Sequence, residues 1–157
     1  MTLLLPPPMR IALDLAAQAA ESGEVPVGAV ITRGGKIIAT ASNAMQLTND
    51  PTAHAEIKAI RIAAAKLDNQ RLTGCDLWVT LEPCAMCAGA IAHARLDRLY
   101  YAASDPKGGG VAHGARVFSH STCHHHPEVY CGIGEVEAGR QLRNFFAVRR
   151  SLASPTD

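Results

Sequence analysis

Two short segments contain the side chains that could do chemistry. The first holds His54 and Glu56, and the second holds Cys84 and Cys87 directly after Pro83. Residues three apart on a helix lie about 60° apart around its axis, so the two thiolates can bind one ion. Residues two apart lie about 200° apart, so His54 and Glu56 are not expected to bind the same ion. The spacing predicts a metal site of one imidazole and two thiolates.

Three protein ligands leave the fourth position of a tetrahedral zinc ion open for water, which is typical of catalytic zinc. Two thiolates cancel the charge of the ion, so its water is less acidic than water on three imidazoles. A carboxylate that moves protons is therefore needed, and Glu56 is predicted to be this group. Glu82 is a competing acid, but we expect it to point away from Cys84 along a strand and to be structural.

Each segment has a simpler explanation when it stands alone. A Cys-x-x-Cys pair is often a redox dithiol or half of a structural zinc site, and His-x-Glu is common on exposed helices. The presence of both segments, each where a helix is expected to begin, favours catalytic zinc. Cys75 is expected to be buried, and Cys131 has no matching spacing. Cys123 stands beside three histidines at 124–126 and could hold adventitious metal.

Helix-like and strand-like patterns alternate along the chain. Helices are predicted at 9–20, 53–66, 84–94 and 137–150, and strands at 28–33, 36–40, 76–81 and 99–102. Residues 43–51 are expected to form a loop, residues 104–127 to be irregular, and residues 128–134 are ambiguous between a loop and a last strand. The glycine pair at 34–35 indicates a hairpin, which makes the sheet mixed. Strands separated by helices indicate an α/β fold with both sheet faces covered.

The length of 157 residues suits a single domain, with a core at about 9–150 and flexible ends at 1–8 and 151–157. The 27 alanines indicate a core of small, closely packed residues. A hydrophobic share of 48% with 18% charged residues argues against intrinsic disorder. We find no signal peptide pattern at the start and no window near the ~20 apolar residues of a membrane span. We therefore expect a cytoplasmic protein whose cysteines are metal ligands or free thiols.

The formal net charge of +1 conceals two stretches without acidic residues. Residues 106–127 contain Lys107, Arg116 and five histidines, and residues 138–155 contain four arginines, including Arg149 and Arg150. A solvated loop and an ordinary helix C-terminus would explain them, but they also suit phosphate contacts. Of the aromatic pair at 145–146, one ring is expected in the core and the other at the core edge or against RNA.

Together the two motifs resemble the signature of the zinc nucleobase deaminases. Within this superfamily, the chain resembles the bacterial tRNA-specific adenosine deaminases over about residues 24–150. The segments that carry the resemblance are Val25–Ala29, Asn43, Asp50–Glu56, Val79–Ala90, Asp105–Gly109 and Phe145–Arg150. The departures are modest: the glycine run at 108–110 is longer, and three histidines precede Pro127.

The resemblance implies a three-layer α/β/α cytidine-deaminase-like fold with a five-stranded mixed sheet, and a homodimer with one Zn²⁺ per subunit on His54, Cys84 and Cys87. The implied reaction is hydrolytic deamination of the wobble adenosine of a tRNA anticodon to inosine, releasing ammonia. Water activated at the metal would attack C6, while Glu56 protonates N1 and helps the amine leave. Asp105 would accept a hydrogen bond from a ribose 2′-OH, which favours RNA. The residues expected to contact the substrate are Val27, Asn43, Ala55 through its N–H, Asp105, Lys107, Arg149 and Arg150.

Other functions share parts of this pattern. The nearest alternative is a free-base or nucleoside deaminase that acts on guanine or cytosine, which has the same zinc motifs. Riboflavin-pathway deaminases have more residues between the two cysteines, and an RNA-binding module with structural zinc would not need Glu56. The basic C-terminal helix and the Asp105 loop favour tRNA, because free bases need no phosphate contacts. Which RNA or single-stranded DNA is accepted stays open.

Overall fold

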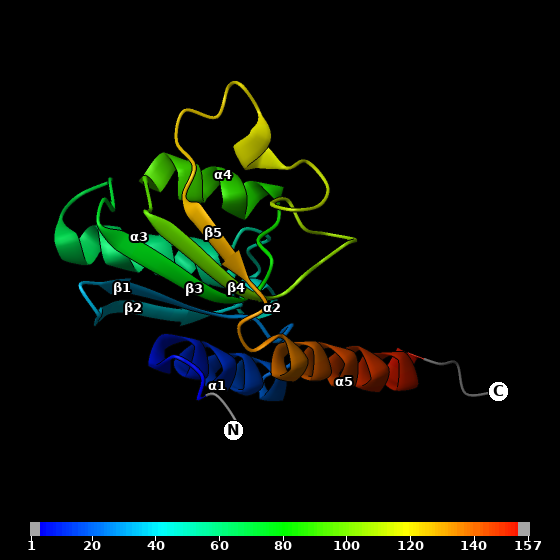
Figure 1. Ribbon diagram of the computed structural model, residues 1–157. Coiled ribbons are helices and arrows are strands. Elements are labelled where there is room, and N and C mark those ends of the chain that lie inside the picture. Colours follow the sequence, from blue (N-terminus) through cyan, green and yellow to red (C-terminus); the bar gives the residue numbers. More distant parts are fainter. Residues whose placement is uncertain (1–3, 154–157) are drawn as a thin grey trace.

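Residues 4–153 are described in a computed structural model, and they form a five-stranded sheet between two layers of helices (Figure 1). The strands are β1 (Gly28–Arg33), β2 (Lys36–Ser42), β3 (Cys75–Leu81), β4 (Arg98–Ala103) and β5 (Glu128–Cys131). Their order is β2-β1-β3-β4-β5. β1 is antiparallel to β2 and β3, whereas β3, β4 and β5 are parallel. The predicted mixed sheet is confirmed.

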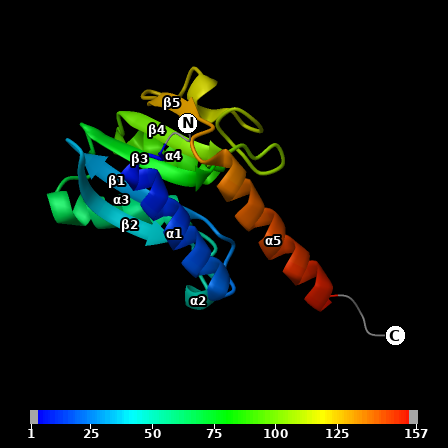
Figure 2. The same ribbon diagram turned by 60° about the horizontal axis from the view of Figure 1, so that its bottom comes forward.

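The helices are α1 (Pro7–Glu21), α2 (Met45–Thr48), α3 (Ala55–Leu67), α4 (Ala85–Ala94) and α5 (Glu135–Ala153), with a 3-10 turn η1 at Val117–Ser119. α1 and α5 cover one face of the sheet, and α3 and α4 cover the other (Figure 1), which confirms the three-layer α/β/α architecture. The C-terminal half of α5 extends past the sheet (Figure 2). Among the helices described, none combines the length and the apolar character needed to cross a membrane.

Alternation along β1 divides the core into two halves. Ala29 and Ile31 belong to the apolar cluster under α3 and α4, and Val30 belongs to the cluster under α1. A Cβ atom at Gly28 would overlap the carbonyl oxygen of Ala12, so glycine is needed where α1 crosses this strand. Small residues therefore set the close approach of helix and sheet, as the alanine content predicts.

Both terminal helices are longer than predicted. α1 starts at Pro7, because proline fits the first helical positions, where the missing N–H has no intrahelical partner. α5 runs from Glu135 to Ala153 and not from 137 to 150. The two helices thus reach into the segments 1–8 and 151–157 that were expected to be flexible. Residues 1–3 and 154–157 lie outside the described residues.

Two other segments differ from their predictions. The expected loop at 43–51 contains the four-residue helix α2. The ambiguous stretch 128–134 forms β5 over its first four residues, as an exposed edge strand beside β4. Cys75 is buried at the start of β3, as predicted.

The paired phenylalanines of α5 lie outside the core, which corrects the expectation that one of them is buried. Phe145 is half-buried and Phe146 is 42% exposed. The reason is the projection of α5 beyond the sheet. Contacts with the core come from the first half of the helix, where Ala138 is buried and Leu142 packs against the same cluster.

Candidate active site

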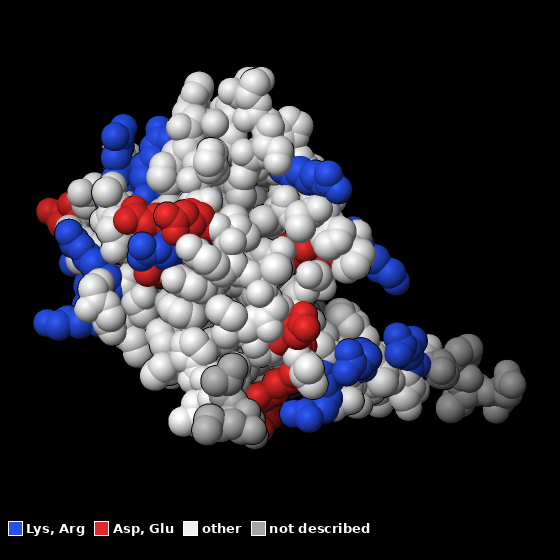
Figure 3. All heavy atoms as spheres, viewed as in Figure 1, with Lys and Arg blue, Asp and Glu red and all other residues white. Residues whose placement is uncertain are grey.

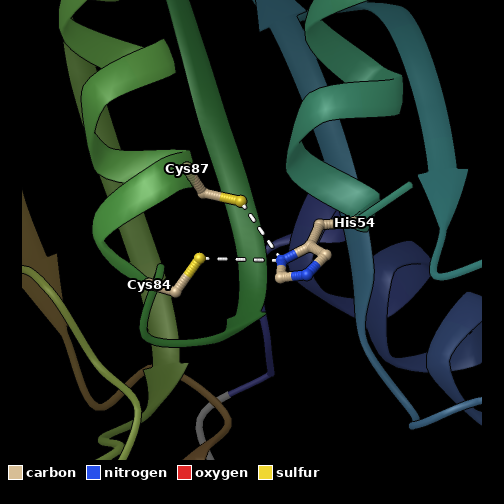
Figure 4. A group of neighbouring side chains, drawn as sticks. All are labelled: His54, Cys84 and Cys87. Atoms are coloured by element: carbon tan, nitrogen blue, oxygen red, sulfur yellow. Dashed lines mark hydrogen bonds between the residues drawn. The ribbon is translucent and has the colours of Figure 1, made fainter. Parts of the chain in front are cut away.

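Three metal-ligating side chains meet where α3 and α4 begin. His54 is the N-cap residue of α3, Cys84 is the N-cap residue of α4, and Cys87 lies in the first turn of α4. Nδ1 of His54 lies 3.6 Å from Sγ of Cys84 and 3.5 Å from Sγ of Cys87 (Figure 4). A tetrahedral zinc ion with ordinary Zn–N and Zn–S bonds would separate these atoms by about 3.6 Å. The donor set and its spacing therefore fit zinc.

No second group of this kind occurs within residues 4–153. The thiol of Cys123 donates to the carbonyl oxygen of His125, and the neighbouring histidines do not converge with it. Cys131 is a free, exposed thiol on β5. The hypothesis of adventitious metal at Cys123 has no preformed site to support it.

The two thiols of the metal group differ in their readiness to lose a proton. A hydrogen bond from the Cys87 thiol, together with the bond to His54, lowers the pKa of Cys84 to about 4. The bond to Cys84 and burial raise the pKa of Cys87. Partial positive charge at the start of α4 also favours a thiolate at its N-cap. These interactions favour the thiolate at Cys84 over that at Cys87.

Glu56 lies in the first turn of α3 and is 4% exposed. Burial raises the pKa of its carboxyl group, which also contacts the Cys87 thiol. Glu56 is absent from the converging ligand group, in agreement with the angular argument from its spacing to His54. It borders the metal group without belonging to it, and this placement suits a group that transfers protons.

A cavity of about 250 Å³ opens beside the metal group. It is smaller than the roughly 300–1,000 Å³ pockets of many small-molecule sites, which suits a single base. Six residues predicted from the sequence line it, namely Val27, Asn43, His54, Glu56, Cys84 and Asp105. Five further lining residues were not among the predicted site residues, namely Val25, Met45, Leu81, Glu82 and Gly108. The residues at 25, 81, 82 and 108 lie within the segments that carry the family resemblance, which was the available signal, and Glu82 was expected to be structural.

The backbone N–H of Ala55, which was expected to recognise the base, already donates a hydrogen bond within the protein. It donates to Oδ1 of Asn43 at 2.8 Å, and Nδ2 of Asn43 donates to the carbonyl oxygen of Val25 at 3.2 Å. The first N–H groups of a helix have no intrahelical acceptor, and Asn43 supplies one for α3. In this geometry Asn43 and Ala55 shape the wall of the cavity together, and the Ala55 N–H does not point free into it.

Asp105 stands at the rim of the cavity. Its Oδ1 accepts hydrogen bonds from the backbone N–H groups of Lys107 and Gly108 at 3.2 and 2.9 Å. Its Oδ2 makes no hydrogen bond within the described part of the chain and stays available for a ligand.

A second cavity, of about 470 Å³, lies between the Asp105 loop and α5. Its lining residues are Lys107, Leu142, Arg143, Phe146 and Arg150, so it joins the two stretches without acidic residues. We call it the cationic groove. Figure 3 shows Lys and Arg side chains, in blue, along the surface of α5.

Arg149 does not line the cationic groove, unlike its neighbour Arg150. Its Nη2 donates to the carbonyl oxygen of Gly23 at 2.9 Å, and its guanidinium lies 4.9 Å from the centre of the Phe145 ring. These contacts within the protein do not test the expected contact of Arg149 with RNA, which stays a prediction. Successive helix residues point in different directions, so Arg149 turns toward the body of the protein instead.

A three-layer fold that presents one histidine, two cysteines and a buried glutamate at two helix N-termini defines the class of zinc-type nucleobase deaminases. The chain belongs to the MafB19-like deaminase family, whose family model matches residues 7–150, and within it to the tRNA-specific adenosine deaminases.

The similarity extends over most of the chain. The tRNA-specific adenosine deaminase of Agrobacterium fabrum is 54% identical over 142 residues, which are 90% of this chain and 93% of the relative. A solved structure from studies of A-to-I editing by tRNA:A34 deaminases at the wobble position of transfer RNA has a TM-score of 0.85 and 53% identity, and the match covers 86% of this chain and 98% of that one. The guanine deaminase of Bacillus subtilis has a TM-score of 0.63 and 31% identity, with 96% of each chain covered.

Proposed function

We propose that this protein is an enzyme that hydrolyses the wobble adenosine of a tRNA anticodon to inosine and releases ammonia. Its family and its similarity to a tRNA:A34 deaminase structure support this reaction. The observation that carries the choice of RNA over a free base is the cationic groove. The loop of Asp105 and Lys107 borders both the groove and the metal-side cavity, so a base in the cavity can keep its backbone in the groove.

The chemistry divides between a metal and one acid. His54, Cys84 and Cys87 would hold one Zn²⁺ per chain, and zinc in such a site supplies Lewis acidity that activates water. Glu56 takes a proton from this water and delivers it to N1 of the adenine ring, and then assists loss of the C6 amine. Water adds its oxygen at C6 and the C6–N bond breaks, so adenosine and water yield inosine and ammonia.

Further residues bind and orient the nucleotide. Val27 and Asn43 line the cavity that receives the base, and the free Oδ2 of Asp105 accepts a hydrogen bond from the ribose 2′-OH. Lys107 and Arg150 neutralise phosphates in the cationic groove. Arg149 ties the end of α5 to the segment after α1 by its bond to Gly23, and we expect it to add an RNA contact from there.

We also propose a homodimer in the cytoplasm, built from one deaminase domain per chain with its core at about 9–150, in which tRNA contacts both subunits. Exposed apolar side chains on the outer faces of α3 and α4 support an interface: Ile62 is 44% exposed and Met86 is 38% exposed. Light scattering on the purified chain tests the dimer, and a monomeric mass at micromolar concentration would reject it.

The deciding experiment compares substrates. The zinc-loaded protein is incubated with an anticodon stem-loop carrying adenosine at the wobble position, and with free guanine, cytosine and adenosine. We expect inosine in the stem-loop and little turnover of the free compounds. A stem-loop with guanosine at the wobble position is the matched control. Turnover of guanine without inosine in the stem-loop would assign the protein to the function of its guanine deaminase relative instead.

A further inference from the structure

A buried carboxylate that the proposed chemistry does not use lies beside the metal ligands. Glu82 follows β3, precedes Pro83, and has a fully buried side chain. Oε1 accepts the backbone N–H of Asp105 at 3.1 Å and lies 2.8 Å from Nδ1 of His113. Oε2 accepts three consecutive backbone N–H groups, those of residues 111, 112 and 113, at 3.1–3.2 Å. The carboxylate thus has five partners, and all belong to the segment 105–113, which we call the substrate loop.

Glycines allow the substrate loop to close this tightly. A Cβ atom at Gly109 would overlap Oε2 of Glu82, and one at Gly110 would lie 2.5 Å from the backbone nitrogen of Ala85. The N–H of Gly110 also donates to the carbonyl oxygen of Pro83 at 2.7 Å. The loop is therefore folded around one buried side chain and against the start of α4.

The substrate loop carries contacts to both halves of the substrate. Asp105 and Gly108 line the cavity for the base, and Lys107 lines the cationic groove. The metal ligands and Glu56 lie on α3 and α4 or at their N-caps, outside this loop. The oxygens of Glu82 are occupied by the loop, so it acts on the substrate through the loop.

We propose that Glu82 is a positioning residue that holds the substrate loop in the conformation that binds RNA, and so sets affinity for RNA without setting the rate of the chemical step. The identity of the substrate rests on the proposed function; the anchoring of the loop does not. When the anchor is lost, the loop samples several conformations. The apparent affinity then falls by the fraction of molecules in the binding conformation.

The substitution Glu82→Gln tests this, because it preserves size but replaces an acceptor oxygen with an amide donor that cannot accept a backbone N–H. Since each lost bond involves a charged acceptor, we expect KM for the stem-loop to rise about tenfold or more. We expect kcat to stay within about threefold and zinc per chain to be unchanged. Hydrogen exchange at the amides of 105 and 111–113 should lose protection. Asp68→Asn, which removes an exposed carboxylate at the far end of α3, is the control.

A second pair of variants covers the case in which Glu82→Gln does not fold. His113→Ala removes one of the five partners and should raise KM, whereas His113→Asn can offer an amide N–H near the position of Nδ1 and should restore much of the affinity. An equal rise of KM in His113→Ala and His113→Asn would contradict an anchoring role for the Glu82–His113 pair.

The readouts separate the possible failures. Unchanged exchange protection in Glu82→Gln would show that Glu82 does not hold the loop. Lost protection with wild-type KM would show that the loop does not bind the substrate. A parallel loss of kcat and zinc would assign Glu82 to the metal site. If the wild-type protein itself leaves the stem-loop unchanged, the proposed function fails, and the exchange experiment still decides whether the loop is anchored.

Discussion

Two of the metal-ligating side chains belong to residues at the N-cap positions of helices. His54 and Cys84 occupy N-cap positions, yet neither side chain makes a capping hydrogen bond. Their side chains are left for a metal, and the unpaired N–H groups of the first turn need acceptors elsewhere. At Ala55 the acceptor is Asn43, twelve residues earlier in the chain.

Spacing within a few residues made the metal group predictable from the sequence. Cys84 and Cys87 had to share one helix face, and the exclusion of Glu56 from the ligand group followed from its two-residue separation from His54. The bond between Asn43 and Ala55 was not predictable, because it depends on the path of the intervening chain. The five bonds that gather at Glu82 were missed for the same reason.

Glu56→Ala should separate chemistry from metal binding. General acid–base catalysis typically contributes 10²–10⁴-fold, so we expect kcat on the stem-loop to fall by about that factor. Zinc content and the unfolding midpoint should stay near wild type, because Glu56 is outside the ligand group. Steady-state kinetics with zinc analysis by mass spectrometry checks this, and wild-type turnover in the variant would remove Glu56 from the mechanism.

Asn43→Ala should destabilise the fold as well as the site. The substitution leaves the buried N–H of Ala55 without an acceptor, which costs about 1–3 kcal/mol. In a chain of this length that loss lowers Tm by several degrees. Calorimetry of the variant beside Asn144→Ala, an exposed change on α5, provides the comparison. Equal melting temperatures would show that Asn43 does not support α3.

Between elements, the contact of α1 with α5 places the basic helix. Arg10 donates to both carboxylate oxygens of Glu137 at 2.8 and 2.6 Å, and Gln141 donates to the carbonyl oxygen of Leu13 at 3.0 Å.

Both helices were predictable from the periodicity of the sequence. Their exact ends were not predictable, because the prolines at the start of α1 and the packing of the first turn of α5 determine them. The short helix α2 has no periodic signal, and Glu24 holds it by accepting the N–H of Leu47.

The Arg10–Glu137 pair should give a stability that depends on pH. The hydrogen bond from Arg10 lowers the pKa of Glu137, so the folded state favours the carboxylate. Glu137→Gln should cost up to roughly 1 kcal/mol at neutral pH, because the pair is partly exposed. The difference from wild type is present above the ordinary Glu pKa of about 4.3 and disappears as pH falls through the lower folded value. Urea unfolding from pH 7 to pH 3 measures it.

Glu135→Gln is the matched control, because it removes a charge from the same helical turn without breaking an ion pair described in residues 4–153. A constant difference between the Glu137 variant and wild type across this pH range would contradict the linkage.

Two glycine-to-alanine changes should have opposite effects on stability. Gly28→Ala places a methyl group on the carbonyl oxygen of Ala12 and should cost about 1–3 kcal/mol or more. Gly89→Ala, inside α4 with open space around its Cα, should be neutral or stabilise by up to about 1 kcal/mol. The denaturant midpoints of the two variants, compared with wild type, measure these effects. An unchanged midpoint in Gly28→Ala would mean that α1 can shift away from β1.

The whole molecule brings together charges that are far apart in the chain. Lys107 comes from the substrate loop and Arg143 from α5, and both line the cationic groove. Two acid-free stretches could be recognised in the sequence, but not which of their cations would share one surface. Arg149 turns toward Phe145, and this orientation depends on how α5 docks on α1.

RNA affinity should depend steeply on salt. Each phosphate neutralised by the groove contributes about 0.7–0.9 to the slope of log K against log salt. Removal of Lys107 or Arg143 by alanine should reduce that slope by roughly one contact each, whereas Lys36→Ala, on the exposed end of the β1–β2 hairpin, should not. Titration of a labelled stem-loop at several salt concentrations measures the slopes. Identical slopes in all variants would place the RNA elsewhere.

The tight closure of the substrate loop has a consequence for how this protein can diversify. The backbone at Gly109 and Gly110 leaves no space for side chains, because Glu82 and the start of α4 fill it. Positions 106, 107, 108 and 112 are exposed on the same loop. We therefore expect new substrate preferences to be most accessible through side-chain changes at 106, 107 and 112, because the two glycines between them leave no space for a larger residue.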